Sequence, residues 1–397
     1  MSFNTYQYGI YFGGMAGQTP ELPVTYEGLR EAAREILPAQ ADGYVAGSAG
    51  TEATEAANRA AFRRWQIVPR MLRDVAERDL SVELLGRRLP TPLLCGPVGV
   101  QSIVHDDAEL GTARGAAAVD VPFVLSTVSS VPMEEVAADV GDHPRWFQLY
   151  WPAEPDLTDS MIQRAADAGY EAVVVTLDTR LLAWRPRDLA TAYLPFLYAE
   201  GLANYLTDPV FLAGLPDEGA AIAEQGWRTM DDETRQQAVL RWIATYSDPG
   251  QTWEDLRELV DRSPLPVLVK GIQHPDDARA AVDAGVAGLV VSNHGGRQVD
   301  GAIGSVDALP GVVDAVAGAV PVLFDSGVRC GADIAVALAL GADAILIGRP
   351  YVWGLALAGA DGVEHVLRSL LADLDLTLAL AGVASVAELT RDTVRHV

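Results

Sequence analysis

His294 and Arg297 lie three residues apart, directly after an apolar, β-branched run, residues 288–291, that predicts a buried strand. Gly295 and Gly296 between them allow the backbone to approach a ligand closely. An imidazole can accept a proton near neutral pH, and a guanidinium can bind a carboxylate through two hydrogen bonds. Together the two side chains indicate chemistry on a small organic acid. A histidine after a strand more often only caps a turn, so the rest of the sequence has to decide between these interpretations.

The composition limits the class of protein. A chain of 397 residues is long enough for one large α/β barrel or for two ordinary domains. No apolar run reaches the length of a membrane span, and the N-terminus lacks the pattern of a signal peptide. Two cysteines, Cys95 and Cys330, argue against a disulfide framework and against a zinc cluster, so we expect no metal. These features predict a cytoplasmic protein with reduced thiols and no membrane partner.

The charge of the chain excludes a further class. Fifty-four acidic side chains against 29 basic ones give a formal net charge of −25. Non-specific binding to nucleic acid needs a basic surface, so we expect no nucleic-acid partner. The same charge repels an anionic substrate at long range. A site for a carboxylate must therefore depend on a few local arginines.

Short apolar strands and Ala-rich helical stretches alternate from Pro92 onward. Eight such units with nearly continuous apolar strands favour a closed parallel (β/α)8 TIM barrel over an open doubly wound sheet. The predicted strands are residues 93–96, 122–126, 146–150, 172–177, 267–270, 288–292, 322–324 and 344–347. Clear helical stretches among the units are residues 162–168, 276–284 and 333–340.

The C-terminal ends of these strands carry groups that can hydrogen-bond or ionise. Active sites of such barrels gather at that end, so this pattern predicts a site there without saying which one. The residues at the strand ends are Pro97-Val98-Gly99, Ser126-Thr127, Gln148-Leu149-Tyr150, Thr176-Leu177-Asp178, Lys270-Gly271, Ser292-Asn293-His294, Asp325-Ser326-Gly327 and Gly348-Arg349.

Two segments lie outside the repeated units of what we predict to be a single domain, residues 1–397. Residues 1–90 are predicted to form an N-terminal helical cap, with a helix over residues 25–37 that Thr25 caps. Tyr44 lies there among small residues that would let its hydroxyl face a cavity, although a core aromatic is the commoner case. Residues 183–250, after the fourth strand, are too long for a loop and predict a lid, a binding loop or an oligomer contact.

Several strand-end residues allow more than one chemistry. Lys270 could be a Schiff-base nucleophile, a phosphate ligand, a fixed charge beside a cofactor or a surface lysine. Residues 325–329 and 348–349 follow the last two strands, where barrels commonly bind phosphate. Arg185 follows the fourth strand, and with Arg297 it could hold a carboxylate from two sides.

The motifs taken together resemble the FMN-dependent 2-hydroxy-acid oxidases, in order and over essentially the whole chain. The matching residues are Pro97-Val98-Gly99, Phe147-Gln148-Leu149-Tyr150, Thr176-Leu177-Asp178-Thr179, Val269-Lys270-Gly271, Ser292-Asn293-His294-Gly295-Gly296-Arg297-Gln298, Asp325-Ser326-Gly327-Val328-Arg329 and Gly348-Arg349-Pro350. Within this family the likeness is greatest to the lactate 2-monooxygenases. It rests on residues 204–211 in the insertion, on residues 184–188 and on the extended N-terminus.

The resemblance implies a role for each group of residues. His294 would be the base, and Asp178 would stabilise the imidazolium that forms. Arg185 and Arg297 would bind the substrate carboxylate, together with the hydroxyls of Tyr44 and Tyr150. The implied FMN contacts are Lys270 at the N1–C2 edge, Thr127, Gln148, Thr176 and Ser292 at the ring, Pro97, Val98 and Gly99 at its face, and Asp325, Ser326, Gly327, Arg329, Gly348 and Arg349 at the phosphate.

The resemblance also implies the reaction and the partners. FMN would oxidise a small L-2-hydroxy acid and O2 would reoxidise it, and a homo-oligomer, tetramer or octamer, is expected. If the keto acid is retained, lactate yields acetate, CO2 and water; if it leaves early, the keto acid and H2O2 are released. Many oxidases of the family carry alanine at the position of Gly99. Val104, Leu181 and Trp184 are candidates for substrate preference. A Schiff-base aldolase using Lys270 and a non-catalytic phosphate-binding barrel are the rival interpretations.

Overall fold

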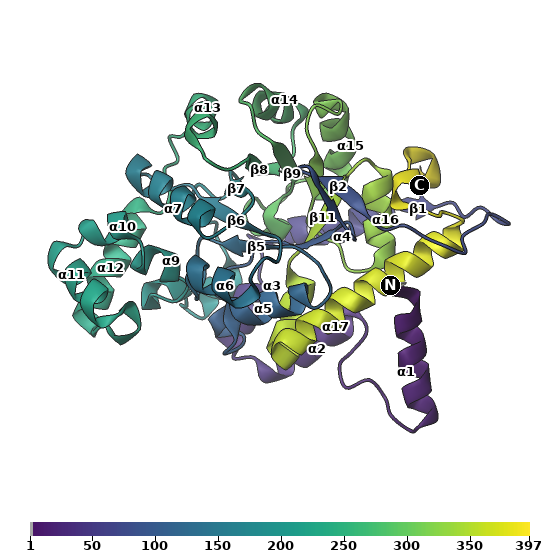
Figure 1. Ribbon diagram of the computed structural model, residues 1–397, viewed down its shortest axis with the longest axis horizontal. Helices are drawn as coiled ribbons and strands as arrows, with labels where there is room; N and C mark the ends of the chain where they lie inside the picture. The colour runs from purple at the N-terminus through teal and green to yellow at the C-terminus, as the bar shows by residue number, and fades with distance from the viewer. Residues whose placement is uncertain (1–2) are drawn as a thin grey trace.

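Eight parallel strands form a closed barrel in the computed structural model, which describes residues 3–397 (Figure 1). Each strand pairs with its neighbour in the chain, and β11 pairs with β4 to close the ring. The barrel prediction is confirmed, and every predicted strand boundary lies within two residues of the observed one. The strands are β4 (Leu93–Cys95), β5 (Phe123–Ser126), β6 (Arg145–Tyr150), β7 (Val173–Thr176), β8 (Val267–Ile272), β9 (Gly288–Val291), β10 (Val322–Phe324) and β11 (Ala344–Ile347).

The apolar runs of these strands form a barrel because both of their faces are buried. Successive side chains point to opposite faces, so alternate residues separate into two cores. One set fills the barrel interior and includes Leu94, Val124 and Trp146. The other set, for example Phe123 and Phe147, packs outward in the larger core that includes the surrounding helices. The polar strand ends therefore come together at one mouth of a filled barrel.

Helices follow the barrel strands and cover the outside of the sheet. The helices that cover the barrel are α5 (Ala108–Ala117), α6 (Met133–Val140), α7 (Pro155–Asp167), α13 (Trp253–Arg262), α14 (Pro275–Asp283), α15 (Ser305–Val316), α16 (Gly331–Ala339) and α17 (Arg349–Ala381). The three predicted helical stretches overlap α7, α14 and α16. Short 3-10 helices are η1 (Phe3–Thr5), η2 (Gln101–Ile103), η3 (Pro195–Tyr198), η4 (Trp227–Thr229), η5 (His294–Gly296), η6 (Val386–Glu388) and η7 (Arg391–Thr393).

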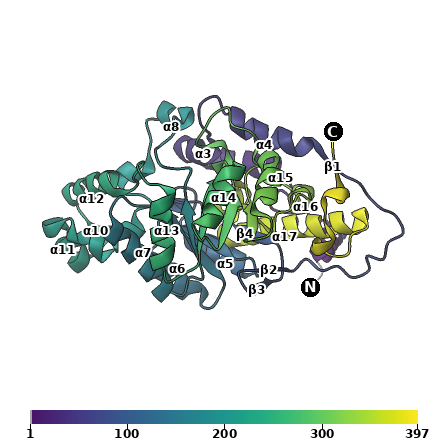
Figure 2. The same ribbon diagram turned by 90° about the horizontal axis from the view of Figure 1, so that it is seen from above.

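The N-terminal segment places α3 (Ala39–Ala46) and α4 (Ala53–Arg63) at one end of the barrel and a hairpin at the other (Figure 2), while its first two helices pack on α17. These two helices are α1 (Tyr6–Met15) and α2 (Tyr26–Ile36). Thr25 caps α2 by accepting a hydrogen bond from the Gly28 amide, as predicted. The segment also holds strands that the sequence did not reveal: β1 (Trp65–Ile67), paired with β12 (Val394–His396), and the hairpin of β2 (Val82–Leu84) and β3 (Arg87–Leu89). Leu84 and Leu89 of this hairpin pack into the barrel-interior core.

Most of the insertion between β7 and α13 forms a helical layer beside the barrel, at the left of Figure 1, while its first helix lies beside α3 (Figure 2). Its helices are α8 (Pro186–Ala190), α9 (Ala203–Leu206), α10 (Pro209–Ala213), α11 (Pro216–Gln225) and α12 (Asp232–Thr245). Residues 199–206 are largely buried, whereas α8 and α11 lie mostly at the surface. Among the described residues, no helix has the length and apolar character needed to cross a membrane.

Candidate active site

The C-terminal ends of the barrel strands, with α3 and α4 of the cap, enclose a cavity. It holds about 1050 Å³ of empty space, part of it open to solvent, which is enough for a cofactor together with a small substrate. Most of the predicted site residues line it, although they are spread over about 300 positions of the sequence. They are Tyr44, Pro97, Val98, Gly99, Tyr150, Arg185, Lys270, His294, Arg297, Asp325, Ser326, Gly327, Arg329, Gly348 and Arg349.

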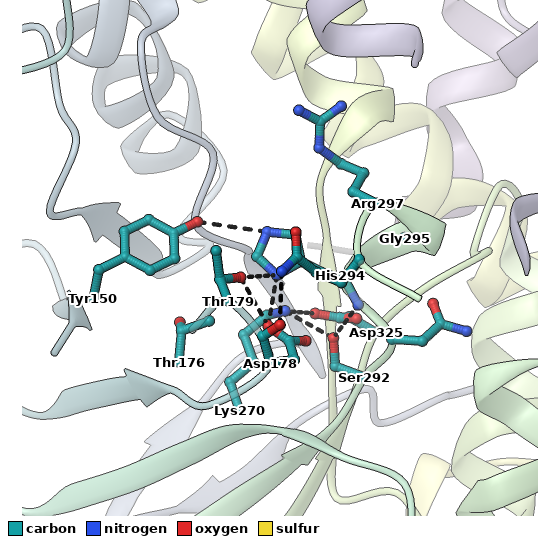
Figure 3. A network of polar contacts seen from close by, with 12 residues as sticks. Tyr150, Thr176, Asp178, Thr179, Lys270, Ser292, His294, Gly295, Arg297 and Asp325 are labelled. Carbon is teal, nitrogen blue, oxygen red and sulfur yellow. Dashed lines mark hydrogen bonds and ion pairs between the residues drawn. The ribbon is translucent and has the colours of Figure 1, made fainter. Parts of the chain in front are cut away.

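His294 is held so that one ring nitrogen faces an acid and the other faces the cavity (Figure 3). Its Nδ1 lies 2.8 Å from Asp178 Oδ1, at the end of β7, and 3.2 Å from the Thr179 hydroxyl. Its Nε2 lies 3.5 Å from the Tyr150 hydroxyl. The backbone of His294 adopts a left-handed conformation, with φ of 57°, which is costly for a residue with a Cβ. This strain aims Nε2 at the cavity, where a base has to be.

Burial favours the neutral form of His294. Burial lowers the pKa of His294, and the nearby Lys270 lowers it further, while Asp178 opposes the shift. Burial alone would raise the pKa of Asp178, but the charges of His294 and Lys270 and the hydrogen bonds to its carboxylate outweigh burial and lower that pKa. At neutral pH the pair is therefore a carboxylate beside a neutral imidazole. Such a pair can accept a proton and stabilise the charge that results.

Lys270 supplies a buried positive charge in the middle of the cavity. Its ammonium group donates to the Ser292 hydroxyl at 2.7 Å and pairs with Asp325 at 3.0 Å. Burial would lower the pKa of Lys270, but the charges of Asp325 and Asp178 outweigh it and raise the pKa. A protonated amine is a poor nucleophile, so this geometry argues against the Schiff-base interpretation.

Arg185 and Arg297 form a cationic pair at the substrate end of the cavity. Arg185 is buried and donates to the Arg297 carbonyl at 3.2 Å and to the Gln298 side chain at 2.8 Å. Arg297 donates to the carbonyls of Tyr44 and Gly47, and its guanidinium lies 5.0 Å from the centre of the Tyr44 ring. Among residues 3–397, neither arginine forms an ion pair with an acidic side chain.

Burial lowers the pKa of Arg185 to about 10, and repulsion by Arg297 contributes to this shift, while Asp188 opposes it. Arg185 is buried and Arg297 is partly buried, and Asp188 is the acidic side chain that acts on both without forming an ion pair with either, so the pair favours an anionic ligand. Donor groups that remain free on both side chains can bind a carboxylate from two sides. Tyr44 and Tyr150 complete this end, and burial raises the pKa of both phenols, so both hydroxyls keep their protons.

Four of the predicted cofactor residues lie next to the cavity without lining it. They form a hydrogen-bonded layer across the ends of β5 to β9. Gln148 accepts from the hydroxyl of Ser126 and donates to that of Thr176 at 3.0 Å. Thr127 accepts from the amide of Tyr150 at 2.8 Å. Ser292 accepts from Lys270 and from the His294 amide. This layer fixes the strand ends and the ammonium group of Lys270.

The loops after β10 and β11 form the opposite end of the cavity. Ser326 and Gly327 are in left-handed conformations, with φ of 83° and 96°, which turn this loop sharply. The Arg329 side chain is buried against the Tyr26 ring, and its Nε has no hydrogen-bond acceptor in the described part of the chain. Its Nη2 lies 3.8 Å from the Glu55 carboxylate, and the Nε donor that has no acceptor suits a phosphate. The residues at this end therefore fit the ribityl phosphate of FMN. The isoalloxazine ring would then lie further along the cavity, beside Lys270.

Arg349 has a different environment from the one predicted. It donates to the carbonyls of Val45, Gly47 and Gly295, each at 2.9 Å, and to the Ser48 hydroxyl at 3.1 Å. Most of its donor groups are therefore occupied by the protein. Arg349 joins residues 45–48 of the N-terminal cap, which we call the cap loop, to the loop of His294. A phosphate contact would use only its remaining N–H.

Some residues of the cavity were not found from the sequence, and some candidates lie elsewhere. Glu55 and Asn58 of α4 line the phosphate end, and Val128 and Val352 line the apolar wall. A glutamate, an asparagine or a valine in a helix or a loop does not by itself indicate a binding site, so the sequence offered no reason to select them. Val104, Leu181 and Trp184, candidates for substrate preference, do not line this cavity: Val104 is buried elsewhere, and the other two are exposed on the loop after β7.

Comparisons with known proteins agree with this geometry. Residues 33–396 match the model of the FMN-dependent dehydrogenase family. An FMN-dependent alpha-hydroxy acid dehydrogenase of Penicillium citrinum is 45% identical, over 100% of this chain and 97% of the relative. An L-lactate oxidase of Lysinibacillus sphaericus is 43% identical, over 96% and 95% of the two chains. A solved structure of mandelate oxidase with (S)-4-hydroxymandelic acid is 39% identical, with a TM-score of 0.80 over 93% of this chain and 98% of that one.

Proposed function

The chain belongs to the FMN-dependent dehydrogenase family and oxidises 2-hydroxy acids with FMN, and on that premise we propose that it is a lactate 2-monooxygenase. The reaction is L-lactate and O2 to acetate, CO2 and water. This product set requires pyruvate to stay in the site until it meets the peroxide that reoxidation of the cofactor produces. The proposal therefore concerns how long the cavity holds the keto acid.

The residues that we propose for the oxidation act on different atoms of the substrate. Arg185 and Arg297 hold the carboxylate, with the hydroxyls of Tyr44 and Tyr150 donating to it or to the substrate hydroxyl. His294 Nε2 takes the hydroxyl proton, and Asp178 stabilises the imidazolium. Bound FMN would supply the acceptor for the two electrons that leave C2 of the substrate, whether as a hydride or by way of a carbanion. Lys270 places a positive charge at the edge of the ring where negative charge accumulates.

The remaining cofactor contacts that we propose hold FMN in place. Thr127, Gln148, Thr176 and Ser292 fix the ring edge, directly or through Lys270. Pro97, Val98 and Gly99 lie against the ring face. The phosphate group lies at the end of the cavity formed by Asp325, Ser326, Gly327, Arg329, Gly348 and Arg349.

One observation carries the monooxygenase proposal: part of the insertion packs directly on the loops that form the wall of the cavity. Gly201 lies against Val100 and Val128, so closely that a Cβ at position 201 would come within 2.7 Å of Val100. The Ser102 hydroxyl donates to Glu200 at 2.9 Å, and the Ala203 amide donates to the Ser129 carbonyl at 3.1 Å. Because these contacts hold the wall of the cavity in place, the keto acid would leave the cavity slowly.

A second candidate function is a 2-hydroxy-acid oxidase that releases the keto acid and H2O2. The relative named L-lactate oxidase, 43% identical to this chain, favours it. The two functions differ in their products, so the test is to supply the purified holoenzyme with L-lactate and measure O2 uptake, acetate, pyruvate and H2O2. The proposal expects one acetate per O2 and little H2O2. Equal amounts of pyruvate and H2O2 would show an oxidase. Mandelate in a parallel assay tests whether an aromatic acid is the better substrate.

Gly99→Ala is expected to raise the release of H2O2 at the expense of acetate. A Cβ at position 99 would lie 2.5 Å from the Val128 carbonyl oxygen, so the loop has to shift away from the wall to which the insertion is bonded. That shift opens a route for the keto acid. The measurement is the ratio of acetate to O2 consumed, with Gly311→Ala in α15 as a control because its Cβ would meet only Pro275, at 3.4 Å. An unchanged ratio in Gly99→Ala would contradict the prediction.

A further inference from the structure

Asn204 of α9 is a fully buried polar residue of the insertion, and the hydrogen bonds of its side chain go to the barrel. Its amide nitrogen donates to the carbonyls of Ser126 and Thr127, at 3.2 and 3.1 Å. Its side-chain oxygen accepts from the Met133 amide at 2.8 Å. One side chain therefore joins the end of β5 to the start of α6. Asn204 also begins the stretch 204–211 that distinguished the insertion in the sequence.

The two carbonyls that Asn204 holds belong to a strand end whose other groups are already paired. The Thr127 amide donates to the Gln148 side chain at 3.3 Å, and its hydroxyl accepts from the Tyr150 amide. The Ser126 hydroxyl donates to Gln148 as well, at 2.9 Å. If Asn204 were removed, both buried carbonyls would lose a hydrogen-bond donor, which costs free energy. The strand end would then rotate to find other donors.

Asn204 can hold this strand end because it is itself fixed. Arg164 of α7 donates to the Asn204 carbonyl at 2.7 Å, and it pairs with Asp208 at 3.0 Å and with Glu134 at 2.8 Å. Asp208 is fully buried and caps α10 by accepting from the amides of Val210 and Phe211. This part of the insertion is therefore anchored to α6 and α7.

We propose that Asn204 is a positioning residue for FMN: it fixes the end of β5 so that Thr127 and Gln148 meet the isoalloxazine ring. The inference rests on the cofactor contacts proposed above for these two residues. It makes residues 199–208 of the insertion part of the cofactor site. It does not depend on whether the product is acetate or pyruvate.

The test compares Asn204→Ala with Asp208→Asn. Asn204→Ala removes both donors to the strand end, and FMN is expected to dissociate about tenfold more readily from the holoenzyme, since each hydrogen bond contributes about that factor or less. Free FMN is measured by its fluorescence on dilution, and the visible absorption spectrum and the reduction potential of bound FMN are recorded. Asp208→Asn disturbs the anchor to Arg164 but leaves the side-chain contacts of Asn204, so it is expected to lower the melting temperature and to weaken FMN binding less than Asn204→Ala does.

Asn204→Ser covers the case in which the alanine variant does not fold, because one hydroxyl can still donate to one carbonyl. Its FMN affinity is expected to lie between those of the wild type and Asn204→Ala. The inference is overturned if the Asn204 variants bind FMN with wild-type affinity and spectrum, or if Asp208→Asn weakens FMN binding as much as they do. Release of pyruvate and H2O2 by the wild type would refute the proposed function and leave this inference intact.

Discussion

Replacing His294 by asparagine is expected to lower kcat/KM for the 2-hydroxy acid on the order of a thousandfold, the contribution of a well-placed general base. Asparagine suits the position because it tolerates the left-handed backbone that His294 adopts, with φ of 57°. FMN is expected to stay bound, because the ring contacts proposed for Lys270 and Gln148 are untouched. Steady-state kinetics and the visible absorbance of the purified variant measure the two effects. A variant with wild-type kcat/KM would exclude His294 as the base.

The pH profile gives an independent measurement of the same role. Burial lowers the pKa of His294 from its usual value of 6.5, so the base is neutral and active at and above that pH. As the pH falls through this lowered pKa, His294 becomes protonated and kcat/KM declines, so the acid limb of the profile is expected below pH 6.5. The limb should be absent from the residual activity of His294→Asn.

His143 provides the matched control for this profile. Burial also lowers the pKa of His143, but its ring nitrogen contacts the Val121 carbonyl at the N-terminal end of the barrel strands, away from the cavity. His143→Gln is therefore expected to keep the acid limb of the wild type. An acid limb above pH 6.5, or one that moves with His143, would contradict the assignment to His294.

The sequence predicted the barrel because its signal is local and repeated. Each strand is a short apolar run that ends in a polar residue, and a parallel barrel brings all of those ends to one mouth. Asp178 and His294 are 116 positions apart, yet their side chains meet at 2.8 Å because β7 and β9 end at the same mouth. For the same reason Lys270 meets both Ser292 and Asp325.

What the sequence could not predict depends on contacts between distant segments. Strands β1 and β12 have three residues each and pair across more than 300 positions, so neither carries a periodic signal. Arg349 follows a strand as phosphate ligands do, but three carbonyls of the cap loop and the His294 loop occupy its donors. The role of Asn204 depends on two carbonyls 77 and 78 positions away, and an asparagine in a helix does not reveal them.

Replacing Arg185 by methionine is expected to raise KM for lactate on the order of a hundredfold, because one or two charge-assisted hydrogen bonds to the carboxylate are lost. Methionine keeps much of the length of the side chain and fills the space without a charge. The effect should depend on the charge of the substrate. Lactamide, which has a neutral amide in place of the carboxylate, is therefore expected to be a much poorer substrate than lactate for the wild type. In the variant the preference for lactate is expected to be much smaller, because Arg297 alone remains to bind the carboxylate.

Arg180→Met is the control, because Arg180 lies on the same loop but is exposed and binds the Gln251 carbonyl outside the cavity. Its KM for lactate is expected to stay within about twofold of the wild type, as for most surface substitutions away from a site. If Arg185→Met kept the wild-type preference for lactate over lactamide, Arg297 alone would bind the carboxylate. The two-sided clamp would then be wrong, and Arg185 would serve only to hold Gln298 and the Arg297 carbonyl in place.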